Sequence, residues 1–246
     1  MAEQRRKWLP ARAADIRTET ATTRSIVFEA PGWMGHLAGQ HVDVKLTADD
    51  GYSAERSYSM AAPADRERIE LTVQRVHDGE VSPYLVDDMM IGDEVELRGP
   101  IGGWFVWRTE EPGPVLLVAG GSGIVPLMAM VRERARVRST APFSLLYSVR
   151  SPDDVFYADE LSRLAGDSSG LNLSLLYTRS APEGTRRPVG RIGADDLAGT
   201  GSPSGAGSRA YVCGPTAFVE AVAVLLQQQG YDASTIRTER FGPTGG

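Results

Sequence analysis

The segment PVLLVAGGSGIVP, residues 114–126, decides the fold. Residues 115–119 form a continuous apolar run, as expected for a parallel strand that is buried on both faces. Three glycines then leave the backbone bare: Gly120, Gly121 and Gly123. Pro126 fits the first turn of a helix, where its missing N–H costs nothing. A strand, a glycine turn and a helix N-terminus in this order can bind a phosphate, and a tight turn without a ligand is the alternative.

The glycine turn differs from three well-known motifs. Pro126 stands where the third glycine of G-x-G-x-x-G would be, and the turn lacks the Gly-Lys-Ser/Thr of a Walker loop. It is not a nucleophile elbow either, because Ile124 stands where the second glycine of that motif would follow Ser122. Pyrophosphate binding is the main interpretation, with these contact residues: Gly121, Ser122, Gly123 and Pro126.

Beyond the glycine turn, helix-like and strand-like segments alternate, which predicts a parallel sheet with right-handed crossovers. Further strands are expected at residues 143–150, 171–178, 209–214 and 235–241. Helices are expected at residues 126–138, 153–164 and 215–229. Ligands of such sheets collect beyond the carboxyl ends of the strands.

Residues 10–110 show a different pattern of short, mostly alternating segments that are separated by Gly- and Asp-containing turns. Strands are expected at residues 16–30, 40–46, 56–60, 68–76 and 93–99, and a short helix at residues 82–89. This spacing predicts an antiparallel barrel or sandwich. We therefore expect a β domain over residues 1–110, followed by a doubly wound, five-stranded parallel α/β domain over residues 111–246.

Composition excludes several classes of protein. The 246 residues carry a formal charge of −6, which offers no overall basic field to nucleic acid or to an anionic membrane. A lone cysteine, Cys213, excludes an internal disulfide framework and a cysteine-ligated iron–sulfur cluster in this sequence. The three histidines have no ligand-like spacing, so no metal site is expected. We find neither an apolar run long enough to span a membrane nor a signal peptide, and the expected location is the cytoplasm.

The segment ERSYSMAAP, residues 55–63, alternates like a strand but is unusually polar. It places a guanidinium, a phenol and two hydroxyls in succession: Arg56, Ser57, Tyr58 and Ser59. These groups can bind a flat, anionic, hydrogen-bonding ligand. The alternative is the solvated side of a sheet.

Five motifs, in this order, resemble the ferredoxin–NADP reductase superfamily: RSYS, DGEVSPYL, GGSGIVP, VCGPTAF and ERFGP. The resemblance covers the chain from about Ala11 to Phe241. It implies an antiparallel flavin-binding β-barrel followed by a parallel NAD(P)-binding domain. The chain continues past Phe241 with GPTGG, unlike plant-type members, and so resembles the bacterial electron-transferase branch more closely.

The resemblance assigns roles in the flavin site. Arg56 would pair with the flavin phosphate, Tyr58 would lie against the isoalloxazine ring, and Ser59 would hydrogen-bond near flavin N5, with Ser57 in the same motif. The segment 79–82 would open a short helix against the phosphates through Gly79, Val81 and Ser82, although an ordinary capped turn fits the same residues. The backbone along the flavin edge would come from Gln74, Arg75 and Val76.

The resemblance also assigns residues near the nicotinamide. Cys213 would face the ring and contribute packing and polarity, not covalent catalysis; a buried small hydrophobe is the alternative. Gly214 and Pro215 would form the turn beneath the dinucleotide. Glu239 and Phe241 resemble the terminal acid and aromatic near the flavin, although Phe241 fits a core position equally well. The candidate catalytic residues, in the sense of positioning for hydride transfer, are Ser59, Cys213, Glu239 and Phe241.

The choice of nucleotide depends on charge, because a 2′-phosphate needs cations whereas a bare ribose diol usually meets an acid. Arginines follow two expected strands and the next loop: Arg150, Arg179 beside Thr178, and Arg187 or Arg191. They favour NADPH over NADH. FAD is expected rather than FMN, because most relatives with this motif set hold FAD.

The resemblance implies a reductase that passes a hydride from NADPH to FAD and electrons to a separate acceptor, a small iron–sulfur or other redox protein that could feed an oxygenase. The first interpretation is a stand-alone reductase without a fused iron–sulfur domain. Two alternatives stay open. One is a diaphorase-like reductase of free flavins or small oxidants, and the other is a regulatory flavin subunit that binds nucleotide without catalysis.

Overall fold

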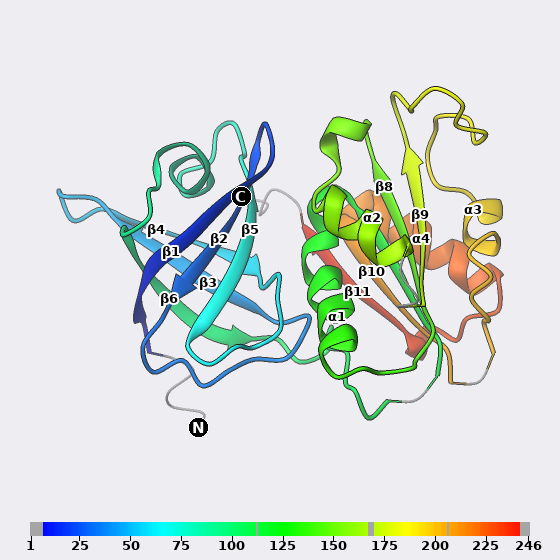
Figure 1. Cartoon of the computed structure of the whole chain (residues 1–246), viewed down its shortest axis with the longest axis horizontal. Coiled ribbons are helices and arrows are strands. Elements are labelled where there is room, and N and C mark those ends of the chain that lie inside the picture. The colour runs from blue at the N-terminus through cyan, green and yellow to red at the C-terminus, as the bar shows by residue number, and fades with distance from the viewer. Residues whose placement is uncertain (1–6, 112, 167–169, 206, 242–246) are drawn as a thin grey trace. The chain divides into compact units, whose positions relative to one another are not determined.

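The structure is a computed structural model that describes residues 7–111, 113–166, 170–205 and 207–241. Its contacts divide the chain into two compact units (Figure 1). The first consists of Met1–Arg108 and Met128–Glu133, and the second of Thr109–Leu127 and Arg134–Gly246. The sequence places the domain boundary after residue 110. None of the helices in the described residues is long and apolar enough to cross a membrane.

The first unit contains a six-stranded antiparallel sheet, which confirms the predicted β domain. Its strands are β1 (Leu9–Thr20), β2 (Thr23–Glu29), β3 (His41–Thr47), β4 (Ser53–Ser59), β5 (Arg68–Gln74) and β6 (Glu94–Ile101). They lie in the order β4-β3-β6-β1-β2-β5. An isolated bridge between Met60 and Leu71 joins the two end strands and closes the barrel.

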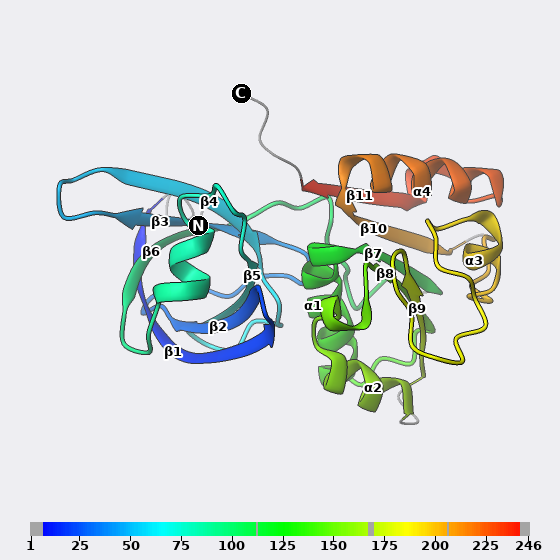
Figure 2. The same cartoon turned by 90° about the horizontal axis from the view of Figure 1, so that it is seen from above.

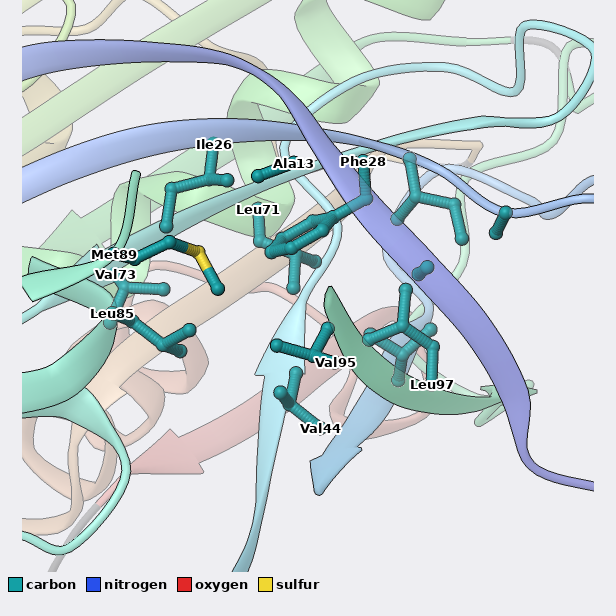
Figure 3. Packing of buried hydrophobic residues seen from close by; sticks show 14 of the residues in the cluster. Ala13, Ile26, Phe28, Val44, Leu71, Val73, Leu85, Met89, Val95 and Leu97 are labelled. Carbon is teal, nitrogen blue, oxygen red and sulfur yellow. The ribbon is translucent and has the colours of Figure 1, made fainter. Parts of the chain in front are cut away.

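Alternation explains the barrel core, since every second residue of a strand points inward. Ile26 and Phe28 of β2 are fully buried, as are Ile69 and Leu71 of β5. Figure 3 shows these strands, β6 and the short π-helix η2 (Tyr84–Asp88) contributing side chains to one cluster. The short helix expected at residues 82–89 is thus present. The single strand expected at residues 16–30 is wrong, because a turn at residues 21–22 divides it between β1 and β2.

The second unit contains a five-stranded, wholly parallel sheet in the order β11-β10-β7-β8-β9. Its strands are β7 (Val115–Gly120), β8 (Phe143–Val149), β9 (Leu171–Tyr177), β10 (Arg209–Pro215) and β11 (Ile236–Phe241). Its α-helices are α1 (Ile124–Arg136), α2 (Ala158–Gly166), α3 (Ala194–Ala198) and α4 (Thr216–Gln228). Figure 2 shows α1 and α2 on one face of the sheet and α4 on the other, which confirms the doubly wound fold.

The α/β unit departs from the sequence-based prediction between residues 152 and 166. A single helix was expected at residues 153–164, but the chain forms the 3-10 helix η4 (Pro152–Asp154) and then α2. Val155 has an extended conformation and Tyr157 has a φ of 57°, so the helical path is interrupted twice. The Tyr147 hydroxyl accepts a hydrogen bond from the Phe156 amide at 3.3 Å within this interruption.

Candidate functional site: a flavin site and a dinucleotide site

Strand β4 separates the RSYS side chains onto two faces. Arg56 and Tyr58 lie opposite Val44 and Val42 of β3, both of which belong to the barrel core. Because directly paired residues of antiparallel strands share a face, Arg56 and Tyr58 project on the core side, and Ser57 and Ser59 on the other. The structure therefore brings Arg56 and Tyr58 together but not all four groups.

The Arg56 guanidinium holds a carboxylate. Its Nη2 donates to Glu80 Oε2 at 2.5 Å, and its Nη1 donates to the Glu55 carbonyl oxygen at 2.7 Å. The Tyr52 hydroxyl donates to the other oxygen of Glu80. These donors hold the pKa of Glu80 below its ordinary value, the Tyr52 hydrogen bond having the larger effect. In return, the carboxylate raises the pKa of Tyr52. The position expected to receive a phosphate is thus an anion site by its own chemistry.

Tyr58 connects β4 to the turn before η2. Its ring packs against the barrel core, and this burial raises the pKa of its phenol, opposed by the nearby Arg56 and by a hydrogen bond with Ser82. Ser82 is buried, and its Oγ also accepts a hydrogen bond from the Val76 amide at 3.0 Å. A Cβ on Gly79 would lie 2.9 Å from Ser82 Oγ, so the turn requires glycine there. Motifs about 20 residues apart in the sequence therefore meet at one place.

The other residues that are predicted to contact the flavin differ in their exposure and in their partners. The side chains of Gln74, Arg75 and Val76 are exposed, and Arg75 is paired with Asp87 at 3.2 Å. Val81 is fully buried in the barrel core, so its side chain packs there and is not open to a ligand. Ser57 donates to Asp43 at 2.6 Å, and Ser59 is buried opposite His41. The contact of these residues with a flavin stays a prediction.

A cleft of about 470 Å³ opens beside the Arg56–Glu80 pair. Tyr52, Glu80 and Tyr84 line it, together with residues from β3 and β6. This volume falls within the range of small-molecule sites, and the two phenol rings provide flat surfaces. Sequence reasoning did not identify this cleft, because its lining comes from four separate segments.

The glycine turn of the second unit is packed against β10. A Cβ on Gly123 would lie 2.1 Å from the Cys213 carbonyl oxygen, and a Cβ on Gly214 would lie 3.1 Å from Gly120 Cα. The motifs GGSGIVP and VCGPTAF therefore meet at the carboxyl ends of neighbouring strands β7 and β10. Gly121 has a φ of +53°, and the space around its missing Cβ is open to 4 Å. Pro126 lies in the first turn of α1, as expected. A pyrophosphate can therefore approach the backbone N–H groups of this turn.

Cys213 lies in the buried part of β10 and pairs in register with Glu239 of β11, while Pro215 pairs with Phe241. Its side chain is fully buried, and burial raises the pKa of its thiol well above the ordinary value; the Glu239 carboxylate raises it further. Glu239 and Phe241 are both partly exposed. The last two residues of the ERFGP motif lie outside the described residues.

We expect the native Cys213 thiol to stay protonated and to resist iodoacetamide from pH 7 to pH 9, and to react once the protein is unfolded. Because the folded pKa is raised, the unfolded thiol releases its proton first as the pH rises, so this group reduces the free energy of unfolding above its ordinary pKa. Mass spectrometry of alkylated native and urea-treated protein measures this, and no second cysteine confuses the signal. Fast alkylation of the native protein at pH 7 would contradict the prediction.

Arg150 and Arg179 follow two neighbouring strands. The Thr178 amide donates to Val149 O and the Arg179 amide to Arg150 O, each at 2.9 Å, so the two strand ends are joined side by side. Both arginine side chains are exposed, and neither has an ion-pair or hydrogen-bond partner within the described parts of the chain. Two cations therefore stand together at the carboxyl edge of the sheet.

Arg187 has a different environment from that pair. Its Nη2 donates to Asp196 Oδ2 at 2.8 Å and to the Arg191 carbonyl at 2.9 Å, and its Nη1 donates to the Pro188 carbonyl at 2.8 Å. This guanidinium holds the pKa of Asp196 below its ordinary value. Arg187 thus organises its own loop, and its predicted contact with a nucleotide stays a prediction.

Comparison with known proteins agrees with this geometry. Residues 12–106 match the oxidoreductase FAD-binding domain, and residues 117–223 match the oxidoreductase NAD-binding domain. The chain belongs to the ferredoxin–NADP reductase superfamily. This confirms the predicted family, fold class and flavin, FAD, and shows that the nucleotide site serves NAD(P).

Relatives of this superfamily member include reductase components of oxygenases. The Ralstonia sp. ferredoxin–NAD(P)+ reductase component of naphthalene 1,2-dioxygenase/salicylate 5-hydroxylase systems is 34% identical over 84% of this chain and 61% of that protein. The glycine betaine monooxygenase reductase subunit of Pseudomonas aeruginosa is 31% identical over 95% and 64%. The chain thus spans less than two thirds of these relatives. The structure of an Amycolatopsis cytochrome P450 reductase, GcoB, superposes with a TM-score of 0.83 at 27% identity, covering 97% of this chain and 71% of that one.

Sequence reasoning did not identify two residues of the candidate flavin site. Glu80 stands inside the GEVS segment, but its neighbours Gly79 and Ser82 drew the interpretation toward the phosphate. Tyr52 follows a turn that the sequence indicates only as a connection between strands. The signal that could have found Glu80 is its charge, because an acid is unexpected in a segment predicted to lie against phosphates.

Proposed function

We propose that this protein is an NADPH-dependent flavoprotein reductase that delivers electrons to a separate redox protein, a small iron–sulfur protein or one of similar function, within an oxygenase system. The observation that carries the proposal is the order of an FAD-binding and an NAD-binding domain along one chain. Relatives described as reductase components of oxygenase systems support it. Neither the free-flavin reductase nor the regulatory subunit is favoured by these comparisons.

Bound FAD would supply the acceptor of a hydride from NAD(P)H and the donor of single electrons to the redox partner. The protein contributes binding and orientation. Arg56 provides a forked donor for the flavin phosphate, and Tyr58 provides an apolar ring surface fixed by core packing. The cleft beside Glu80 is our candidate for the adenosine half of FAD. At the second site, Gly121 and the N-terminus of α1 receive the pyrophosphate of the nucleotide. Ser59, Cys213, Glu239 and Phe241 are proposed only as positioning residues.

Anaerobic stopped-flow absorbance tests the proposal. Flavin-loaded protein is mixed with NADPH and, separately, with NADH, and the flavin absorption band is followed. We expect fast bleaching with NADPH and slower bleaching with NADH. A bound flavin that neither nucleotide reduces would contradict the reductase function, and equal rates would contradict the preference for NADPH. The cytoplasmic location is likewise a proposal, which cell fractionation tests.

We propose that Arg150 and Arg179 bind the 2′-phosphate of NADPH, since both cations are exposed and unpaired within the described residues. An Arg179→Ala substitution is expected to raise the KM for NADPH by about 10- to 100-fold, the value of a charge-assisted hydrogen bond, and to leave the KM for NADH nearly unchanged. Steady-state kinetics with both nucleotides measures this. Arg163→Ala, an exposed arginine in the last turn of α2, is the control. Equal changes in both KM values would refute the assignment.

A further inference from the structure

The two outer nitrogens of the Arg56 guanidinium each donate a hydrogen bond within the protein. Nη2 donates to the Glu80 carboxylate at 2.5 Å and Nη1 to the Glu55 carbonyl at 2.7 Å. A phosphate that binds Arg56 through a fork of two donors competes with Glu80 for Nη2. It therefore meets a negatively charged group at the place where it binds.

Glu80 is held in this position from two sides. One carboxylate oxygen accepts a hydrogen bond from Arg56. The other accepts a hydrogen bond from the hydroxyl of Tyr52, which lies in the β3–β4 connection. Glu80 also precedes Val81 and Ser82, which are both buried, so its backbone is anchored next to the flavin site. Its side chain and that of Arg56 remain 45% and 46% exposed, which leaves the carboxylate free to move away when another anion arrives.

We propose that Glu80 is an internal anion that occupies the phosphate position on Arg56 in the flavin-free protein, and that FAD must displace it to bind. This inference rests on the flavin site of the proposed function. It makes Glu80 a determinant of FAD affinity and exchange. The carboxylate orients Arg56 before FAD binds and compensates its charge. It also weakens the binding of FAD, because the carboxylate and the FAD phosphate are both negatively charged.

Equilibrium dialysis of flavin-free protein with FAD and with riboflavin tests the proposal. Glu80→Gln keeps the shape of the side chain and removes its charge. We expect the FAD dissociation constant of this variant to fall about tenfold at low ionic strength. The riboflavin constant is expected to stay unchanged, because riboflavin carries no phosphate. The gain for FAD is expected to shrink in 0.5 M NaCl, since salt screens exposed charges.

Glu55→Gln is the matched control. Glu55 adjoins Arg56 on the same strand, and its carboxylate approaches Arg98 at 3.4 Å. This variant makes the same change in net charge without freeing Arg56. We expect its FAD affinity to stay within about twofold of the wild type, because the charge is exposed and screened. An equal gain in both variants would overturn the proposal in favour of a general charge effect.

A double-mutant cycle with Tyr52→Phe adds a second measurement. Loss of the Tyr52 hydroxyl removes one of the two hydrogen bonds that hold Glu80. This variant is therefore expected to bind FAD about two- to threefold more tightly, since a hydrogen bond at the surface contributes little. The same substitution in the Glu80→Gln background should have no further effect. Unchanged or weaker FAD binding by Glu80→Gln overturns the inference alone. If neither the wild type nor Glu80→Gln binds FAD although both are folded by circular dichroism, the proposed function falls with it.

Discussion

A Gly123→Ala substitution is expected to destabilise the NAD-binding unit severely. The new Cβ would lie 2.1 Å from the Cys213 carbonyl oxygen and 2.4 Å from its carbonyl carbon. Both are backbone atoms of β10, the strand that β7 and β11 flank, and backbone cannot move aside as a flexible side chain can. Overpacking of this kind costs about 3 kcal/mol or more. For a chain of this size, that cost lowers Tm by roughly 6–12 °C.

Thermal unfolding followed by circular dichroism measures the effect of Gly123→Ala. Gly166→Ala is the control, because it lies in the same unit, at the end of α2, and the space around its missing Cβ is open to 4 Å. This control should unfold within about 1 °C of the wild type, since exposed substitutions change stability by only about 0.5 kcal/mol. A Gly123→Ala variant as stable as Gly166→Ala would show that the glycine turn and β10 do not approach as described.

An Arg56→Ala substitution is expected to raise the FAD dissociation constant by about 100-fold, the upper part of the range for hydrogen bonds to charged groups. Removal of the guanidinium removes the hydrogen-bond donors proposed for the phosphate. It also leaves the Glu80 carboxylate without its positively charged partner. Riboflavin affinity should change little. Titration of flavin-free protein by isothermal calorimetry measures both constants.

Arg68→Ala is the control for Arg56→Ala. Arg68 is also an exposed arginine of the barrel, and it pairs with Glu29 at 3.1 Å in a similar surface ion pair. It lies on β5, outside the RSYS and GEVS motifs. Its removal should leave FAD affinity unchanged. If Arg56→Ala and Arg68→Ala bound FAD equally well, the assignment of Arg56 to the flavin phosphate would be refuted.

Local pattern was sufficient to predict the order of most elements. The continuous apolar run at residues 115–119 and the glycines that follow it indicated a buried strand and a helix start, and the structure has β7, a 3-10 turn and α1 there. The alternating segments likewise became an antiparallel sheet. In both cases neighbouring residues are enough for the prediction, because the type of element and its burial determine the spacing of apolar residues along the chain.

The side-chain partners could not be predicted in this way. Arg187 was expected to meet a nucleotide, but in the folded chain its guanidinium is held by Asp196 and by carbonyls of its own loop. Arg56 was expected to await a phosphate, and it holds Glu80, which lies 24 positions away in the sequence. Such pairings depend on where loops return in space, and charge alone does not reveal which cation remains unpaired.

The closure of the barrel has a consequence for the flavin site. Strand β4 is an end strand of the sheet order, and its junction with β5 consists of the Met60–Leu71 bridge and the hydrogen bond from the Ala61 amide to the Glu70 carbonyl at 2.8 Å. Local opening of a fold begins where the fewest backbone hydrogen bonds resist it. The strand that carries Arg56 and Tyr58 is therefore the part of the barrel that separates most readily. Any ligand bound only to the closed form stabilises that form by mass action. On our proposed assignment of Arg56 and Tyr58 to FAD, bound FAD would hold β4 in the closed barrel, and opening of this seam would be coupled to loss of the flavin.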